Sequence, residues 1–237
     1  MSYTILAIPT YNEVDNIIPL YKLIRKYNKS LKILFIDDNS NDGTIAKIKS
    51  IKKNDSNITL KVRDRKLGIG SAHKYAFRWA IKNNIKCLVT MDADFTHDPK
   101  LIQKMLKLKD NFHIIQTNRF LNKKSISSWP IHRVVLTNLR YYLLYILLNI
   151  SYDSSGAFRC YNFNKFNPNI IFKVKNNGYS FFWESMFLFC NLNFKIKEIS
   201  SIQKYRNKGT SKLTINEWVL GLVYVFYIFV TKRLLRN

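Results

Sequence analysis

The sequence predicts an α/β fold built on a doubly wound, mostly parallel central sheet. Short apolar runs alternate with segments whose apolar residues recur at helical spacing, as far as about residue 117. Polar clusters stand directly after several of these runs, where the carboxyl ends of parallel strands form the ligand-binding edge of such a sheet. The chain has 237 residues, which allows one full domain with its own core and a small appendage.

Five strands are expected, each a short apolar run that fits a strand buried on both faces. They cover residues 3–9, 31–36, 58–62, 86–91 and 112–117. Helical patterns fill the intervals between them. These patterns run over residues 12–27, 44–51 and 68–82, and a further helix begins at Asp98-Pro99, with proline at its favoured first position.

Two apolar stretches follow the end of this alternation. Residues 134–150 carry a single charge, Arg140, and fit either a buried packing helix or a membrane-contacting one. Residues 218–230 contain 13 residues without a charge or an amide. A helix of that length spans about 20 Å, short of the roughly 30 Å of a bilayer core, so we expect an interfacial or re-entrant, membrane-associating helix. The predicted organisation is one domain over residues 1–213 and a C-terminal apolar and basic helix over residues 214–237.

The chain is strongly basic, with 39 lysine and arginine residues against 15 acidic ones and a net charge of +24. Its 47% hydrophobic and 14% aromatic content excludes a disordered basic tail. The charge favours an anionic partner, which leaves nucleic acid, a membrane surface or a phosphorylated substrate open. Drift in an AT-rich genome would also produce the excess of lysine, asparagine and isoleucine.

The cysteines and the N-terminus give expectations about the compartment. Cys87, Cys160 and Cys190 are widely spaced and form no CxxC pair, which argues against a disulfide framework or a zinc site and for a reducing compartment. The first residues show no basic region followed by a long apolar run, so no signal peptide is evident.

Two acidic motifs stand at predicted strand ends. Asp92-Ala93-Asp94 follows the fourth strand and offers two carboxylates, the hard oxygen ligands that Mg²⁺ and Mn²⁺ take beside a diphosphate. A solvated loop is the alternative for so short a motif. Asp37-Asp38 follows the second strand and suits hydrogen bonds to a nucleotide base or ribose. Ser40 or Asp42 would cap the helix that begins at Thr44. Asp37 and Asp38 lie too far upstream of that helix to cap it.

A glycine-rich segment and a set of cations complete the motifs. Residues 66–70 lack the third glycine of a dinucleotide fingerprint, and no Walker motif occurs in the chain. Five cations stand in polar or aromatic contexts, and arginine is suited to bidentate phosphate binding. They are Arg119, Arg133, Arg159, Arg206 and Lys212.

Taken in chain order, the motifs resemble those of the family 2 glycosyltransferases with a GT-A fold, and within them the polyprenol-phosphate (dolichol-phosphate) mannose synthases. The resemblance covers about residues 3–213. One departure is Asn118 before Arg119, where a serine or threonine is usual. The matching segments are residues 9–13, 36–44, 66–70, 91–99, 117–120, 129–133, 153–159, 178–181 and 206–213.

The resemblance implies a site for a sugar nucleotide, a divalent metal and an acceptor phosphate. The predicted nucleotide-binding residues are Pro9, Tyr11, Glu13, Asp37, Asp38, Lys66, Gly70 and Asp92. The ion would be Mg²⁺ or Mn²⁺, held by Asp92 and Asp94 with Thr96 as a further candidate ligand. The predicted catalytic residues are Asp94, Arg119, Arg133, Arg206 and Lys212, and the predicted acceptor-binding residues are Arg119, Arg133 and Ser155.

The implied reaction is inverting, metal-dependent transfer of mannose from GDP-mannose to a polyprenyl (dolichyl) phosphate. The enzyme would bind the anionic cytosolic face of a membrane as a peripheral or monotopic protein. A phosphate monoester is anionic near neutral pH, so it needs no general base to attack the anomeric carbon.

Two alternatives remain at this stage. Another family 2 transferase would use UDP-glucose or another sugar nucleotide, with a lipid-phosphate or saccharide acceptor. A saccharide would need a general base, for which Glu184 is the candidate. A non-catalytic basic protein that binds nucleic acid or an anionic membrane is the third hypothesis, but no nucleic-acid-binding motif occurs.

Overall fold

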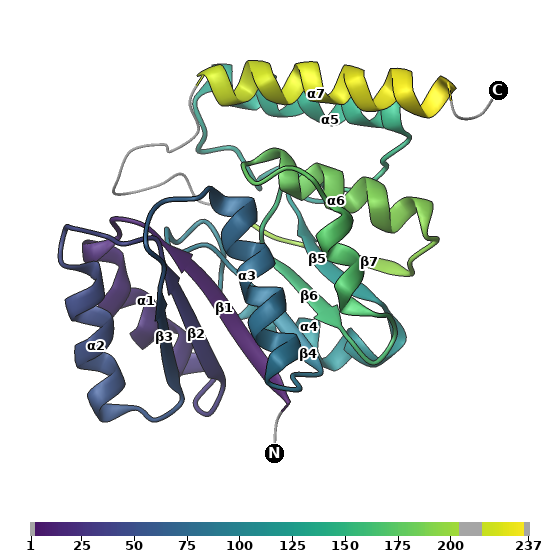
Figure 1. Ribbon diagram of the computed structural model, residues 1–237. Helices are drawn as coiled ribbons and strands as arrows, with labels where there is room; N and C mark the ends of the chain where they lie inside the picture. Colours follow the sequence, from purple (N-terminus) through teal and green to yellow (C-terminus); the bar gives the residue numbers. More distant parts are fainter. Residues whose placement is uncertain (1–2, 204–214, 235–237) are drawn as a thin grey trace.

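The computed structural model describes residues 3–203 and 215–234, and it contains one mixed sheet of seven strands with helices on both faces (Figure 1). The strand order is β3-β2-β1-β4-β6-β5-β7, and β6 alone runs antiparallel to its two neighbours. The strands are β1 (Thr4–Thr10), β2 (Lys32–Asp37), β3 (Ile58–Val62), β4 (Cys87–Thr90), β5 (Ile114–Asn118), β6 (Arg159–Asn162) and β7 (Ile196–Ser200).

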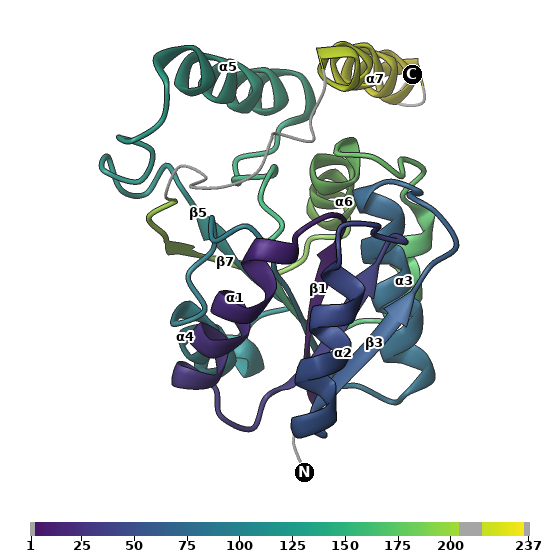
Figure 2. The same cartoon turned by 90° about the vertical axis from the view of Figure 1, so that its left-hand side faces the viewer.

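The helices divide between the two faces of the sheet, which confirms the doubly wound arrangement (Figure 2). Successive side chains of a strand point to opposite faces. On β1, Ile5 and Ala7 therefore join the core with α3 and α6, while Leu6 and Ile8 join the core with α1, α2 and α4. The helices are α1 (Val14–Tyr27), α2 (Thr44–Asn54), α3 (Ile69–Lys82), α4 (Leu101–Leu108), α5 (Ile131–Leu148), α6 (Ser180–Asn191) and α7 (Ile215–Leu234), with short 3₁₀ turns at Lys109–Asn111 and Pro168–Lys173.

The sequence patterns locate β1 to β5 and α1 to α4 within a few residues, but they miss β6, α6 and β7. Strand β6 begins with Arg159, a fully buried arginine inside a strand, which no apolar pattern reveals. Its guanidinium donates to Ser185 Oγ at 2.8 Å and to the carbonyl oxygens of Ser154 and Phe182 at 2.9 and 3.0 Å. These contacts with distant parts of the chain hold β6 in place. The sheet is mixed because β6 lies between β4 and β5 and runs antiparallel to both.

Helices α5 and α7 pack side by side at one end of the molecule, above α6 (Figures 1 and 2). Leu144 and Leu148 of α5 are buried, but Ile131 and Ile146 of the same helix are 82% and 73% exposed. Helix α5 is thus buried on one side and exposed on the other, and it is not enclosed within the core. Within residues 3–203 and 215–234, no helix is long and apolar enough to cross a membrane.

Candidate active site

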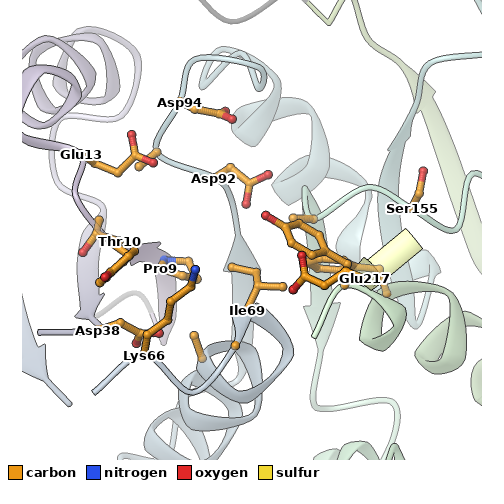
Figure 3. Close-up of a pocket in the computed structure, with 17 residues that line it drawn as sticks. Pro9, Thr10, Glu13, Asp38, Lys66, Ile69, Asp92, Asp94, Ser155 and Glu217 are labelled. Carbon is orange, nitrogen blue, oxygen red and sulfur yellow. The ribbon is translucent and has the colours of Figure 1, made fainter. Parts of the chain in front are cut away.

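A cleft lies at the carboxyl ends of β1, β2 and β4, where the sequence places its polar clusters (Figure 3). It encloses about 850 Å³ when its open mouth is counted, a size suited to a nucleotide-sized ligand. Eight of the predicted site residues line it together, namely Pro9, Tyr11, Glu13, Asp38, Lys66, Asp92, Asp94 and Ser155.

Asp37 belongs to the support of the cleft and does not line it. Its carboxylate is fully buried and accepts hydrogen bonds from Thr10 Oγ1 at 2.7 Å and from the backbone N–H and Oγ of Ser40 at 2.7 and 2.8 Å. Ser40 Oγ in turn accepts the backbone N–H of Asn12 at 2.8 Å. The predicted nucleotide-binding residue Asp37 therefore joins the ends of β1 and β2, because its oxygens are occupied by these donors.

Asp38 and Lys66 form the polar wall at one end of the cleft. The Arg63 guanidinium donates to Asp38 Oδ1 at 2.5 Å and to Ser71 Oγ at 2.8 Å, which orients the Asp38 carboxylate. Burial raises the pKa of Asp38 above its usual value, although Arg63 acts in the opposite direction. The Lys66 ammonium lies 5.0 Å from the centre of the Tyr11 ring. An aromatic ring, a carboxylate and a cation on one wall suit the base and phosphates of a nucleotide.

The loop after β4 holds the two carboxylates of the acidic motif. Asp94 Oδ1 accepts the Thr96 hydroxyl at 2.6 Å and the Thr96 backbone N–H at 3.1 Å. The backbone N–H of Asp92 donates to His97 Nδ1 at 3.1 Å, so this nitrogen of the buried imidazole carries no proton. Burial lowers the pKa of His97 to about 4 and keeps the ring neutral. These bonds fix the loop that presents Asp92 and Asp94 to the cleft.

The carboxylates of Asp92 and Asp94 in this loop fit a divalent metal ion that binds together with a diphosphate. Mg²⁺ and Mn²⁺ are commonly held through one or two carboxylates and complete their shell with substrate phosphates and water. Among residues 3–203 and 215–234, no group of three or more His, Cys, Asp or Glu side chains that could hold a metal ion is found. Thr96 serves Asp94 as a hydrogen-bond donor, and its role as a metal ligand stays a prediction.

Gly68 and Gly70 allow close packing at the start of α3. Gly68 has φ +90°, and a Cβ there would lie 2.4 Å from the Asn177 carbonyl oxygen. A Cβ on Gly70 would lie 2.5 Å from Phe181 Cβ. Gly68 lines the cleft, but the structure places Gly70 beneath the segment before α6. Gly70 thus serves close packing in this structure, because backbone and side-chain atoms fill the space beside it, and its nucleotide-binding role stays a prediction.

Arg119 is joined to the cleft through the segment before β6. Asp153 Oδ2 accepts the Arg119 Nε–H at 2.7 Å and its backbone N–H at 3.1 Å. Burial acts to raise the pKa of Asp153, but Arg119 outweighs it and holds that pKa below its usual value. Arg119 Nη2 lies 3.6 Å from the position of a Cβ on Gly156, next to the Ser155 that lines the cleft. The Arg119 guanidinium therefore lies beside Gly156, next to the side of the cleft that Ser155 lines.

The other predicted cations have different positions. The guanidinium of Arg133, on α5, lies 5.5 Å from the centre of the Trp129 ring, and that of Arg119 lies 5.7 Å from the same ring. The structure thus brings Arg119 and Arg133 to one indole. Arg206 and Lys212 lie outside the described residues, so their roles stay predictions.

Glu184 is not in the cleft. Its two carboxylate oxygens accept the backbone N–H groups of Lys175 and Asn176 at 2.7 and 2.9 Å, and the side chain is buried. Glu184, the candidate base for a saccharide acceptor, therefore holds the backbone of Lys175 and Asn176, in the segment that packs against α3.

Several lining residues were not predicted as site residues. Most are small or apolar positions that carry no chemical signal, but Tyr179 and Glu217 are polar and lie far along the chain from the acidic motif. Tyr179 belongs to one of the resembling segments, whereas Glu217 carried no signal beyond being the single acidic residue of the C-terminal helix. The unpredicted lining residues are Thr10, Gly68, Ile69, Ala72, Ala93, Ala157, Tyr179, Phe182 and Glu217.

The chain resembles known proteins over most of its length. It is 27% identical to the polyprenol monophosphomannose synthase of Mycolicibacterium smegmatis over 214 residues, which cover 89% of this chain and 81% of the relative. It is 25% identical to the undecaprenyl-phosphate mannosyltransferase of Micrococcus luteus over 209 residues, which cover 87% and 86% of the two chains.

Solved structures share the fold at low sequence identity. Glucosyl-3-phosphoglycerate synthase of Mycobacterium tuberculosis, in complex with Mn²⁺, UDP and glucosyl-3-phosphoglycerate, superposes with a TM-score of 0.66 at 15% identity, covering 94% of this chain and 77% of that one. A mannosyltransferase of Pyrobaculum calidifontis in complex with GDP-Man and Mn²⁺ gives a TM-score of 0.57 at 15% identity, covering 99% and 64%.

The family model described as glycosyl transferase family 2 matches residues 5–170, which include all of β1 but its first residue, β2 to β6 and all eight predicted nucleotide-binding residues. Together with the cleft at the strand ends, this match shows that the chain belongs to glycosyl transferase family 2 and is a glycosyltransferase.

Proposed function

We propose that the enzyme transfers mannose from GDP-mannose to a polyprenyl phosphate, with inversion at the anomeric carbon. The observation that carries the proposal is the division of the cleft. Nucleotide-type side chains line one end, Asp92 and Asp94 lie between, and Ser155 with Arg119 behind it forms the other side. The two mannosyltransferase relatives, whose names specify polyprenol and undecaprenyl phosphate products or acceptors, support the choice of acceptor.

The acceptor phosphate requires positioning and charge neutralisation more than proton removal. One of its anionic oxygens forms the new bond to the anomeric carbon while the bond from that carbon to the diphosphate oxygen breaks. The electron pair of the broken bond leaves with GDP, and attack from the opposite face inverts the configuration. Arg119 and Arg133 suit the acceptor phosphate, because guanidinium groups pair with phosphate oxygens in a bidentate way.

Asp92 and Asp94 would hold the divalent cation in this scheme. When bound, Mg²⁺ or Mn²⁺ neutralises charge on the departing diphosphate. The protein contributes the fixed loop in which the Thr96 hydroxyl bonds to Asp94 and His97 accepts the Asp92 backbone N–H.

The outer faces of α5 and α7 support binding to the cytosolic surface of an anionic membrane. Their exposed apolar side chains recur at helical spacing and lie on two helices packed side by side, which suits insertion to a shallow depth. A charge of +24 favours an anionic lipid surface. These exposed side chains are Ile131, Val135, Leu136, Leu139, Tyr142, Tyr145 and Ile146 on α5, and Val219, Leu220, Val223, Phe226, Tyr227 and Val230 on α7.

A donor panel tests the proposal. The full chain is incubated with Mg²⁺, undecaprenyl or dolichyl phosphate in vesicles, and labelled GDP-mannose, UDP-glucose or other sugar nucleotides in parallel. We expect labelled lipid with GDP-mannose, accompanied by released GDP. Labelled lipid only with UDP-glucose would establish the alternative donor, and transfer to a saccharide but not to the lipid would overturn the proposed acceptor.

A further inference from the structure

Glu217 lies in the first turn of α7 and lines the cleft. Every other lining residue belongs to the first 182 residues of the chain. Figure 3 shows the Glu217 carboxylate directed into the cleft, across from Asp38 and Lys66. The C-terminal helix thus supplies a charged group to a site that is otherwise built by the central sheet.

Under the proposed function, Glu217 would lie at the sugar end of a bound donor. Asp38 and Lys66 lie at the end of the cleft proposed for the nucleotide, and Asp92, proposed with Asp94 to hold the metal at the diphosphate, lies between that end and Glu217 (Figure 3). A sugar linked to that diphosphate extends beyond the two aspartates, away from the nucleotide. Among the side chains that the structure describes, the polar groups on that side of the cleft are Ser155, Tyr179 and Glu217.

The placement of Glu217 follows from the inner face of α7. Glu217, Gly221, Tyr224 and Val225 recur at helical spacing and share this face. A Cβ on Gly221 would lie 3.2 Å from Ser180 Oγ, so glycine allows α7 to approach α6 closely. One turn later, the Tyr224 ring packs against Trp183 with ring centres 5.3 Å apart, and Val225 is buried. This contact holds the first turn of α7 over the cleft.

We propose that the Glu217 carboxylate accepts hydrogen bonds from hydroxyl groups of the donor sugar and contributes to the choice of sugar. An ionised carboxylate accepts from two neighbouring hydroxyls at once, and such charge-assisted bonds are about twice as strong as neutral ones. Sugars of the same size differ in the direction of single hydroxyls, so a fixed, half-buried acceptor discriminates among them. The inference rests on the proposed use of a sugar nucleotide, but not on which one is used.

The test compares the affinities for a sugar nucleotide and for its nucleoside diphosphate. Isothermal titration calorimetry with Mg²⁺ measures binding of GDP-mannose and GDP, and of UDP-glucose and UDP, to the wild type and to Glu217→Gln. Glutamine has the same shape but no charge. We expect the variant to bind the preferred sugar nucleotide about tenfold more weakly and to bind the diphosphate alone as the wild type does. Asp15→Asn, at an exposed carboxylate in the first turn of α1, is the matched control and should change neither affinity.

The outcomes separate this inference from the proposed function. Equal weakening of both ligands, or unchanged affinity for the sugar nucleotide, would overturn the role of Glu217. Unchanged affinities combined with lost turnover would assign Glu217 as a general base instead and also overturn it. A wild type that binds UDP-glucose and not GDP-mannose contradicts the proposed donor, and the role of Glu217 is then decided on the UDP pair. A wild type that binds neither pair overturns both.

Discussion

The donor side of the cleft and the pair of helices α5 and α7 are built in opposite ways. On the donor side, short hydrogen bonds hold the residues of the strand ends, as in Asp37 with Thr10 and Asp94 with Thr96. On α5 and α7, the outward side chains are apolar and exposed, and Leu220 for example is 66% exposed. The difference is that the polar side chains of the strand ends are held in place by hydrogen bonds within the protein, whereas α5 and α7 leave apolar side chains exposed, as the proposed membrane binding requires.

Removing a carboxylate from the donor side should have the largest effect. We expect Asp92→Ala to lower turnover by about a thousandfold or more, because the departing diphosphate loses its charge stabilisation. The measurement is the rate of labelled lipid formation, with circular dichroism to confirm the fold. Asp98→Asn is the control, because it removes an exposed carboxylate four residues after Asp94, and this variant should retain near wild-type turnover. An unchanged rate in Asp92→Ala would contradict the metal role.

Removing a cation from the acceptor side should have a smaller and more selective effect. We expect Arg133→Ala to raise KM for the lipid phosphate by about ten- to a hundredfold, since a charge-assisted phosphate contact contributes roughly 1.5–3 kcal/mol. Affinity for GDP-mannose should stay the same. Lys124→Ala removes an exposed cation seven residues before α5 and serves as the control. A matching loss of donor affinity in Arg133→Ala would show that the two sides are not separate.

A charge placed on the outer helices should affect only the lipid-dependent steps. We expect Leu220→Glu to weaken binding to anionic vesicles by about tenfold, because an exposed apolar contact is replaced by a charge repelled by the lipid. Vesicle co-sedimentation measures this, and calorimetry should show unchanged binding of GDP-mannose. Val62→Glu makes the same kind of change at a half-exposed valine on β3 and should leave vesicle binding intact. Equal losses in both variants would argue against a dedicated surface.

The smallest effect on activity is expected at His73, which instead controls stability at acidic pH. The ring is fully buried against Phe181 and Phe182, and neither of its nitrogens has a hydrogen-bond partner among the residues that the structure describes. Burial lowers the pKa of His73 to about 3, so the unfolded chain takes up a proton near pH 6.5 while the folded chain stays neutral. Stability contributed by this group is therefore lost as pH falls below about 6.5.

The variant His73→Phe should remove this pH dependence. We expect the free energy of unfolding of the wild type to drop by about 2 kcal/mol more than that of the variant between pH 7 and pH 5. Urea unfolding at the two pH values measures the difference. A parallel decline in both proteins would contradict the assignment, and turnover at pH 7 should be the same in both.

The same contrast explains what the sequence predicts and what it does not. The strand ends with Asp38, Asp92 and Asp94 were predictable because each βα unit carries its own local pattern of apolar runs and turns. Asp37 and Gly70 do not line the cleft, and a motif does not reveal which of its adjacent residues is buried in the protein.

Features created by contacts distant in the chain were beyond sequence patterns. Strand β6 depends on the buried Arg159, whose partners Phe182 and Ser185 lie on α6. Glu217 lines the cleft from α7, which approaches Ser180 of α6 closely at Gly221. Neither arrangement follows from a local sequence pattern, because each depends on contacts between segments that are far apart in the chain.

The most direct test of the proposed reaction is its stoichiometry. The full chain is mixed with GDP-mannose, Mg²⁺ and vesicles that contain undecaprenyl phosphate, and released GDP and mannosylated lipid are counted in the same samples. We predict one mannosyl lipid for each GDP, and no GDP release when the lipid phosphate is left out or when EDTA removes the metal. GDP release that continues without the lipid, with free mannose as the product, would contradict a transferase dedicated to a lipid phosphate.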